Sequence, residues 1–169
     1  GGSQGSHRIN SVFTRAVPLL EKRTDFQCVH ITGGRDFLSL QKSYRYTTIK
    51  HRVFDFLPQM QWAYSAADLV ICRAGAGTIT ELAYFRKAAI VIPYPYAGGH
   101  QVENARMLAK NKAARVIEEK VLTFSSLSEA VINLIDAKAE REKLENNISQ
   151  FVTIDARERL ADLAVNLVS

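Results

Sequence analysis

Residues 69–86 read LVICRAGAGTITELAYFR, and this segment has the pattern of a strand, a turn and a helix. It opens with a continuous apolar run, 69–72, which is typical of a β-strand buried on both faces. A glycine-rich turn follows at Gly75 and Gly77, and residues 78–86 then have the length and amphipathic pattern of a helix. A strand, a glycine turn and a helix in succession begin a βαβ unit. The stretch therefore predicts an α/β fold with a parallel sheet covered by helices.

The same alternation runs through the whole chain. With 169 residues, 47% of them hydrophobic, the chain is long enough for a single domain (1–169) with one core. We expect a Rossmann-like sheet whose central strands are the two continuous apolar runs, 69–72 and 89–92. The expected strands are 27–32, 49–56, 69–73, 89–93 and 114–117. The expected helices are 9–22, 59–65, 78–86, 101–110, 126–136, 139–150 and 156–168.

Composition argues against several classes of function. The net charge is +5, but the basic residues are scattered and not interleaved with aromatic ones, which argues against a nucleic-acid partner. The four histidines lack the spacing of a zinc site, so no metal is expected. Cys28 and Cys72 lie in apolar runs and are interpreted as core residues in a reducing compartment. No apolar stretch is long enough for a membrane span, which favours a cytoplasmic protein that is peripheral to the membrane at most.

Three glycine-containing loops are expected at the carboxyl ends of strands, where ligands bind in open α/β sheets. They are 1–6, 73–78 and 93–101. The first two enter helix N-termini, where backbone N–H groups and the helix dipole favour a phosphate. The first loop lacks the Lys-Ser/Thr ending of a nucleoside-triphosphate P-loop. In the second, the third glycine of a dinucleotide motif would fall on Thr80, and no acidic residue occurs from 82 to 102, which argues against NAD.

Four polar side chains in these loops or in the helices that follow them have both structural and ligand-binding interpretations. Glu81 ends a capping-box pattern that starts at Thr78, yet a carboxylate one turn from a phosphate cradle can also accept two ribose hydroxyls. His100, Gln101 and Asn104 offer donors and acceptors suited to sugar hydroxyls. His100 is alternatively a helix cap, and Asn104 alternatively lies on an exposed helix face.

The leading glycine-rich turn has no strand before it, although such a turn normally follows one. We therefore expect a first strand and a further domain to precede Gly1 in a longer protein. A linker scar is the alternative interpretation of Gly1-Gly2-Ser3.

Several motifs, in matching order and spacing, carry a family resemblance. Residues 1–5 (GGSQG) with Asn10, residues 72–81 (CRAGAGTITE), Pro93-Tyr94 and residues 100–105 (HQVENA) resemble the C-terminal domain of MurG-type glycosyltransferases, as does the tail at 154–160. The resemblance covers nearly the whole chain. It implies the C-terminal half of a GT-B enzyme of glycosyltransferase family 28, which binds UDP-N-acetylglucosamine.

The resemblance also implies roles for individual residues. Ser3, Gln4 and the helix start at 76–78 would face the diphosphate. Phe56, Leu57 and Met60 would hold the uracil, Glu81 the ribose, and His100 and Gln101 the sugar. The complete set of implied donor-binding residues is Ser3, Gln4, Asn10, Phe56, Leu57, Met60, Arg73, Gly75, Ala76, Gly77, Thr78, Glu81, His100, Gln101 and Asn104.

The implied reaction is inverting transfer of N-acetylglucosamine to lipid-linked N-acetylmuramoyl-pentapeptide in peptidoglycan synthesis, with no cofactor. The general base and the membrane-facing patch would belong to an N-terminal acceptor domain, so this chain is expected to bind donor without turnover. Two alternatives stay open at this point. One is the donor half of another family 28 glycolipid glycosyltransferase, and the other is a non-catalytic nucleotide-sugar-binding module.

Overall fold

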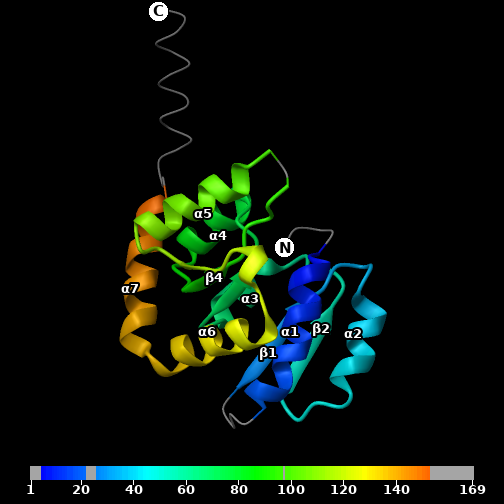
Figure 1. The fold of residues 1–169 in the computed structure, drawn as a ribbon. Coiled ribbons are helices and arrows are strands. Elements are labelled where there is room, and N and C mark those ends of the chain that lie inside the picture. Colours follow the sequence, from blue (N-terminus) through cyan, green and yellow to red (C-terminus); the bar gives the residue numbers. More distant parts are fainter. Residues whose placement is uncertain (1–4, 22–25, 97, 153–169) are drawn as a thin grey trace, which may run out of the picture.

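The structure is a computed structural model and describes residues 5–21, 26–96 and 98–152. Strands and helices alternate along the chain, and the helices lie outside the strands (Figure 1). The strands are β1 (Gln27–Ile31), β2 (Lys50–Phe54), β3 (Val70–Cys72), β4 (Ala89–Val91) and β5 (Arg115–Val116). The helices are α1 (His7–Leu20), α2 (Phe37–Tyr44), α3 (Met60–Ala66), α4 (Ala76–Tyr84), α5 (His100–Lys110), α6 (Phe124–Asp136) and α7 (Lys138–Ile148), with 3-10 turns η1 (Glu119–Val121) and η2 (Ser149–Phe151). The predicted α/β class is confirmed.

All strand pairs are parallel, but they form two sheets and not the single one expected. β1 pairs with β2, with Gln27 opposite Lys50 and Ile31 opposite Phe54. The second sheet has the order β3-β4-β5. Because the strands are parallel, the loops that follow them emerge at a common edge within each sheet, which is where the glycine-rich turns lie.

The central strand of the larger sheet is β4, as its apolar run predicted. The side chains of residues 89–92 are completely buried. Ile90 and Ile92 belong to one apolar core and Ala89 and Val91 to the other, so the alternation of a strand divides its side chains between two faces. The first core packs α1 and α6 against the strands, and the second packs α4 and α5.

The expectation that 69–72 is a second central strand is wrong. Among the described residues β3 is an edge of its sheet, and Val70 and Ile71 are only half-buried. The apolar run reflects burial of the two faces of the strand by helices. Hydrophobic periodicity does not show whether such a strand is also paired along both of its edges.

The remaining differences concern helices. Helix α2 was not predicted, because its eight residues alternate Leu with Ser, Gln and Lys and give a weak apolar stripe. The helix expected at 156–168 lies outside the described residues. Within the described part of the chain, no helix combines the length and the apolar character that crossing a membrane requires.

Candidate functional site

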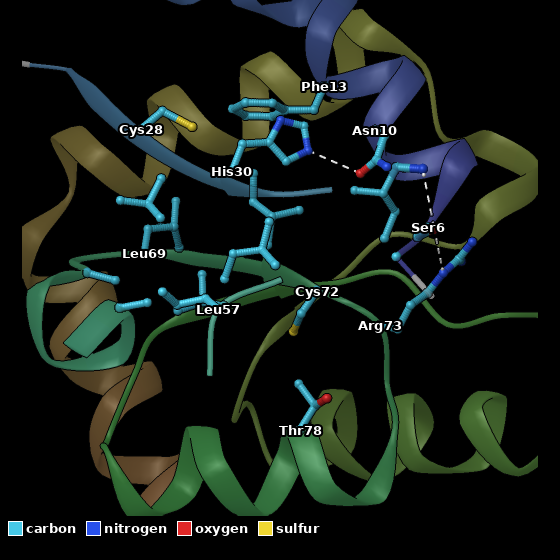
Figure 2. A pocket seen from close by; sticks show the side chains of 18 of the residues that line it. Ser6, Asn10, Phe13, Cys28, His30, Leu57, Leu69, Cys72, Arg73 and Thr78 are labelled. Atoms are coloured by element: carbon cyan, nitrogen blue, oxygen red, sulfur yellow. Dashed lines mark hydrogen bonds between the residues drawn. The ribbon is translucent and has the colours of Figure 1, made fainter. Parts of the chain in front are cut away.

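A cavity of about 1600 Å³ opens at the carboxyl ends of the strands and extends between β1 and β3 (Figure 2). Its lining contains ten of the predicted site residues: Asn10, Phe56, Leu57, Met60, Arg73, Gly75, Gly77, Thr78, Glu81 and Gln101. Ala76 is the first residue of α4, between two of the lining glycines. His100 and Asn104 lie on α5 but do not line the cavity, and Ser3 and Gln4 lie outside the described residues.

The N-terminus of α1 enters this cavity. Ser6 is the N-cap, and its hydroxyl accepts from the N–H of Ile9 at 3.5 Å. Gly5 has a φ of +70°, and a Cβ added there would lie 1.9 Å from the carbonyl oxygen of Thr32. Only glycine allows the turn to pass so close to the end of β1, which explains why the sequence has a glycine immediately before the cap.

The N-terminus of α4 lies on the same cavity and has no side-chain cap. Its N-cap is Gly75, and no side chain accepts a hydrogen bond there. A Cβ added at Gly77 would meet no atom within 4 Å, so open space lies in front of the first turn. The uncapped N–H groups of this turn, together with the helix dipole, form a favourable place for an anion.

Glu81 does not form the capping box that the sequence allows. The helix begins at Ala76, two residues before Thr78, so Thr78 is inside the first turn and is not the cap. One carboxylate oxygen of Glu81 instead accepts from the hydroxyl of Tyr64 at 2.8 Å. Tyr64 is 4% exposed, and its ring stacks on Phe85 with a centroid distance of 5.3 Å.

The Tyr64 hydroxyl acts as a fixed donor. Burial, together with the hydrogen bond to Glu81 and the charge of that carboxylate, raises the pKa of Tyr64 above its usual range, so the hydroxyl keeps its proton. Tyr64 lies on α3, the helix that follows Phe56 and Leu57. The hydrogen bond therefore joins the segment expected to hold a base to the carboxylate expected to hold a ribose.

Arg73 connects the loops around the cavity. Its Nε donates to the Ser6 hydroxyl at 3.0 Å, and its Nη1 donates to the carbonyl oxygens of Ile92 and Pro93, both at 3.2 Å. The same nitrogen forms an ion pair with Glu119 at 2.5 Å. These partners come from three separate segments, so the guanidinium has a supporting position. Direct contact of Arg73 with a ligand stays a prediction.

Asn10 is buried, at 4% exposure, in a chain of polar groups. Its amide nitrogen donates to the Thr32 carbonyl and to Asp36, both at 2.8 Å. The amide oxygen of Asn10 can only accept, so the His30 Nε2, 3.0 Å away, carries the ring proton and donates it. The His30 Nδ1 then accepts from the Tyr44 hydroxyl. Burial lowers the pKa of His30 to about 4, only partly offset by Asp36, which keeps the ring neutral. These contacts give Asn10 a structural position beside the first turn.

Asp36 collects two donors beside the N-terminus of α1. Besides Asn10, the Nδ1 of His7 donates to it at 2.9 Å. Burial alone would raise the pKa of Asp36, but these hydrogen bonds outweigh it and lower the pKa below its usual value. A stable carboxylate here fixes the loop after β1 against the first turn of α1.

Helix α5 contributes through its first two turns. Its N-cap is Gly99, in the left-handed region with a φ of +76°, so His100 is the first helical residue and not the cap. Gln101 accepts from the N–H of Tyr94 at 3.0 Å. Asn104 is half-buried and donates to the Ala74 carbonyl at 2.9 Å, which fixes α5 to the loop before α4. The interpretation of Asn104 as an exposed surface residue is therefore wrong.

Sequence reasoning missed several residues of the site. His7 and Arg8 open α1, and Arg35 and Asp36 follow β1; all four line the cavity. The signal for Arg35 and Asp36 was the Gly33-Gly34 pair directly after an expected strand, a fourth loop of the same kind. No sequence pattern identified Tyr64 as a site residue, because the apolar face of a helix does not indicate which hydroxyl reaches a carboxylate on another helix.

Comparison with known proteins agrees with this geometry. Residues 1–166 match the glycosyltransferase family 28 C-terminal domain. A UDP-N-acetylglucosamine–N-acetylmuramyl-(pentapeptide) pyrophosphoryl-undecaprenol N-acetylglucosamine transferase of Syntrophus aciditrophicus is 41% identical over 170 residues, which cover 99% of this chain and 47% of that protein. The transferase of the same name from Geotalea daltonii is 40% identical, covering 96% and 45%. The chain thus spans about half the length of the curated relatives it matches.

Comparison with solved structures also identifies glycosyltransferases. The crystal structure of Acinetobacter baumannii MurG superposes with a TM-score of 0.85 at 30% identity, over 96% of this chain and 47% of that one. The glycosyltransferase VinC, solved in complex with dTDP, shares the fold, with a TM-score of 0.64 at 20% identity over 83% and 32%. The family model covers residues 1–166, and the fold and the sequence motifs agree with it. The chain therefore belongs to glycosyltransferase family 28 and corresponds to the C-terminal domain of that family.

Proposed function

We propose that this chain is the donor-binding domain of an inverting transferase that moves N-acetylglucosamine from UDP-N-acetylglucosamine to a lipid-linked N-acetylmuramoyl-pentapeptide. The observation that carries the proposal is that two helix N-termini and the Tyr64-supported carboxylate of Glu81 share one cavity. Membership of family 28 and relatives named for this transfer support the choice of donor and reaction.

The diphosphate is assigned to the two helix N-termini. The uncapped first turn of α4, at 76–78, offers N–H groups without a competing side chain. Ser3 and Gln4, which come shortly before α1 in the sequence and lie outside the described residues, are also assigned to the diphosphate. Negative charge grows on UDP as the bond to the sugar breaks, and preorganised N–H groups stabilise that charge without rearranging. The departure of UDP therefore needs no cofactor in this proposal.

The nucleoside is assigned to the side of the cavity lined by α3 and α4. Phe56, 57% exposed, and Leu57 provide apolar surface for the uracil, with Met60 beside them. Glu81 accepts the two ribose hydroxyls, and Tyr64 holds the carboxylate in place. An ionised carboxylate accepts such hydrogen bonds more strongly than a neutral group does.

The sugar is assigned to the start of α5. His100 is exposed at the first helical position, next to Gln101, which lines the cavity. The side chain of Gln101 is oriented by the Tyr94 N–H. We assign Asn104 a positioning role, because its amide is engaged with the Ala74 carbonyl.

The acceptor is assigned to a part of the protein outside this chain. The relatives are about twice as long, and we place the general base, the lipid-linked acceptor site and the membrane contact in an N-terminal domain. The chain alone then binds the donor and does not transfer the sugar. A radiolabelled transfer assay with a lipid-linked acceptor checks this, and measurable product from the isolated chain would contradict it.

Calorimetric titration tests donor binding. We expect heat with UDP and UDP-N-acetylglucosamine, weaker binding of UDP-glucose, and an affinity for UDP that falls in Glu81→Ala. The matched control is Glu142→Ala, an exposed carboxylate on α7 outside the cavity lining. Equal UDP affinities of the wild type and Glu81→Ala would contradict the ribose assignment.

Two alternatives make different predictions. The donor half of another family 28 glycolipid glycosyltransferase would bind UDP but prefer a sugar without the N-acetyl group. A non-catalytic module would bind the donor, and the longer protein containing it would show no transfer to any lipid acceptor. The identity of the relatives and the coverage of 99% of this chain favour the N-acetylglucosamine assignment.

A further inference from the structure

Glu119 brings a negative charge to the wall of the cavity near the helix N-termini. It is the first residue of η1, in the segment that follows β5, and it lines the cavity together with Ser6 and Gly75. Among the described residues, its buried Oε2 accepts no hydrogen bond and has the guanidinium of Arg73 as its ion-pair partner, at 2.5 Å. A carboxylate is an unexpected group at this place, because the ligand assigned to it is itself an anion.

The ion pair adjoins both helix N-termini that are assigned to the diphosphate. The Nε of Arg73 donates to the hydroxyl of Ser6, the N-cap of α1, at 3.0 Å (Figure 2). The backbone of Arg73 directly follows β3 and leads through Ala74 to Gly75, the N-cap of α4. The carboxylate of Glu119 is therefore separated from the N-cap of α1 by a single guanidinium group.

Water screens the two charges of this ion pair only in part. The side chains of Arg73 and Glu119 are 11% and 18% exposed, so their fields act in a medium of lower dielectric than bulk water. Without Glu119, the charge of Arg73 would add to the two helix dipoles and strengthen the attraction for any diphosphate. The carboxylate offsets that charge, which leaves the backbone N–H groups as the main attraction for the ligand.

The sugar nucleotide and free UDP differ in charge at the diphosphate. In UDP-N-acetylglucosamine both phosphates are esterified, and each carries a single negative charge. The terminal phosphate of UDP carries a further negative charge above its second pKa, which is about 6 for a phosphate monoester. A negative charge fixed beside the diphosphate therefore repels UDP more strongly than it repels the sugar nucleotide. Additional N–H donors have the opposite effect, because they attract the more highly charged UDP more strongly.

We propose that Glu119 is a specificity-determining residue that favours UDP-N-acetylglucosamine over free UDP and thereby promotes release of the product. The inference rests on the proposed function and adds to it a residue that belongs to none of the glycine-containing loops. Glu119 acts on the diphosphate through its charge, and the ion pair with Arg73 holds that charge in place. The two helix N-termini then bind the donor without retaining UDP after transfer.

Calorimetric titration of Glu119→Gln with both nucleotides tests the proposal, at about pH 8, in low salt and without divalent cations. Glutamine keeps the length of the side chain and removes its charge. We expect UDP to bind about fivefold more tightly than to the wild type and UDP-N-acetylglucosamine about twofold more tightly. Both gains should shrink in about 0.5 M NaCl, because salt screens the charges.

The matched control is Glu118→Gln. Glu118 precedes Glu119 in the chain, is exposed, forms an ion pair with Lys120 at 2.7 Å and does not line the cavity. Its substitution removes the same charge, and we expect the ratio of the two dissociation constants to stay at the wild-type value. Glu119→Met, which also removes the charge, repeats the measurement, and thermal unfolding checks the fold of each variant.

Equal gains for the two nucleotides, no gain, or weaker binding in Glu119→Gln would overturn the proposal, as would the same change of ratio in Glu118→Gln. Loss of the fold in both Glu119 variants would also overturn it, because Glu119 would then be a structural residue. If the wild type binds both nucleotides and Glu119→Gln leaves their ratio unchanged, this inference fails and the proposed function stands. If the wild type binds neither nucleotide, both fail.

Discussion

Replacing Tyr64 with phenylalanine isolates the contribution of one hydroxyl to donor binding. The ring is 4% exposed and stacked on Phe85, and phenylalanine keeps both features. What is lost is the 2.8 Å hydrogen bond to Glu81. A hydrogen bond to a charged group contributes about 1.5–3 kcal/mol when it is well buried. Because Glu81 is exposed and water replaces part of the bond, we expect about 1 kcal/mol, or about a fivefold loss of UDP affinity.

The assay is calorimetric titration with UDP in a double-mutant cycle. Tyr64→Phe should weaken UDP binding in the wild-type background and have no further effect in Glu81→Ala, because the hydroxyl acts through that carboxylate. The matched control is Tyr84→Phe, which removes a hydroxyl from a side chain that is 70% exposed on the same helix as Glu81. An equal loss of affinity in both backgrounds, or an unchanged affinity in Tyr64→Phe, would show that the Tyr64 hydroxyl does not act through Glu81.

Three further predictions concern stability and the phosphate cradle. Gly5→Ala should lower the free energy of unfolding, measured in urea, by about 2 kcal/mol or more, because the added Cβ would lie 1.9 Å from the Thr32 carbonyl oxygen. The control is Gly34→Ala, whose added Cβ meets no atom within 4 Å. An equal loss of stability in the control would contradict the explanation. The pKa of His30 is lowered in the folded state to about 4, so the unfolded chain takes up the proton first, and the free energy of unfolding should fall by up to about 3 kcal/mol as pH drops from about 6.5 to about 4. The pH dependence measured in urea should be shallower in His30→Gln, and an identical slope would contradict this assignment. Gly77→Ala should stabilise the protein by up to about 1 kcal/mol in thermal unfolding, because alanine favours the helix and its Cβ meets no atom within 4 Å. The same substitution should weaken UDP binding in titration. An unchanged UDP affinity would show that Gly77 does not contribute to the phosphate site.

The sequence was sufficient to predict the parallel α/β class, the strand positions and three loops whose described residues include several that line the cavity. These features depend on local signals: an apolar run such as 89–92, a glycine pair, and the amphipathic segment after it. Boundaries moved by a few residues where the signal was weak. The start of α4 moved from Thr78 to Ala76 because a glycine cap, unlike Ser or Thr, leaves no side-chain signature at the helix start.

The contacts that support the site residues could not be predicted from the sequence. Tyr64 and Glu81 are 17 residues apart, and the partners of Arg73 lie on three segments. Such pairs depend on how α3, α4 and the loops pack together, which no local pattern encodes. The edge position of β3 was missed for a related reason, since apolar runs report burial of the faces of a strand and not the pairing of its edges.

The most direct test of the central claim is a titration of the ¹⁵N-labelled chain with UDP, followed by the chemical shifts of its backbone amides. The donor-binding account predicts saturable shifts at the first turns of α1 and α4, in the loop containing Phe56 and Leu57, and around Glu81. Saturable shifts confined to a surface outside these segments, or no shifts at millimolar UDP in a chain with a well-dispersed spectrum, would contradict it.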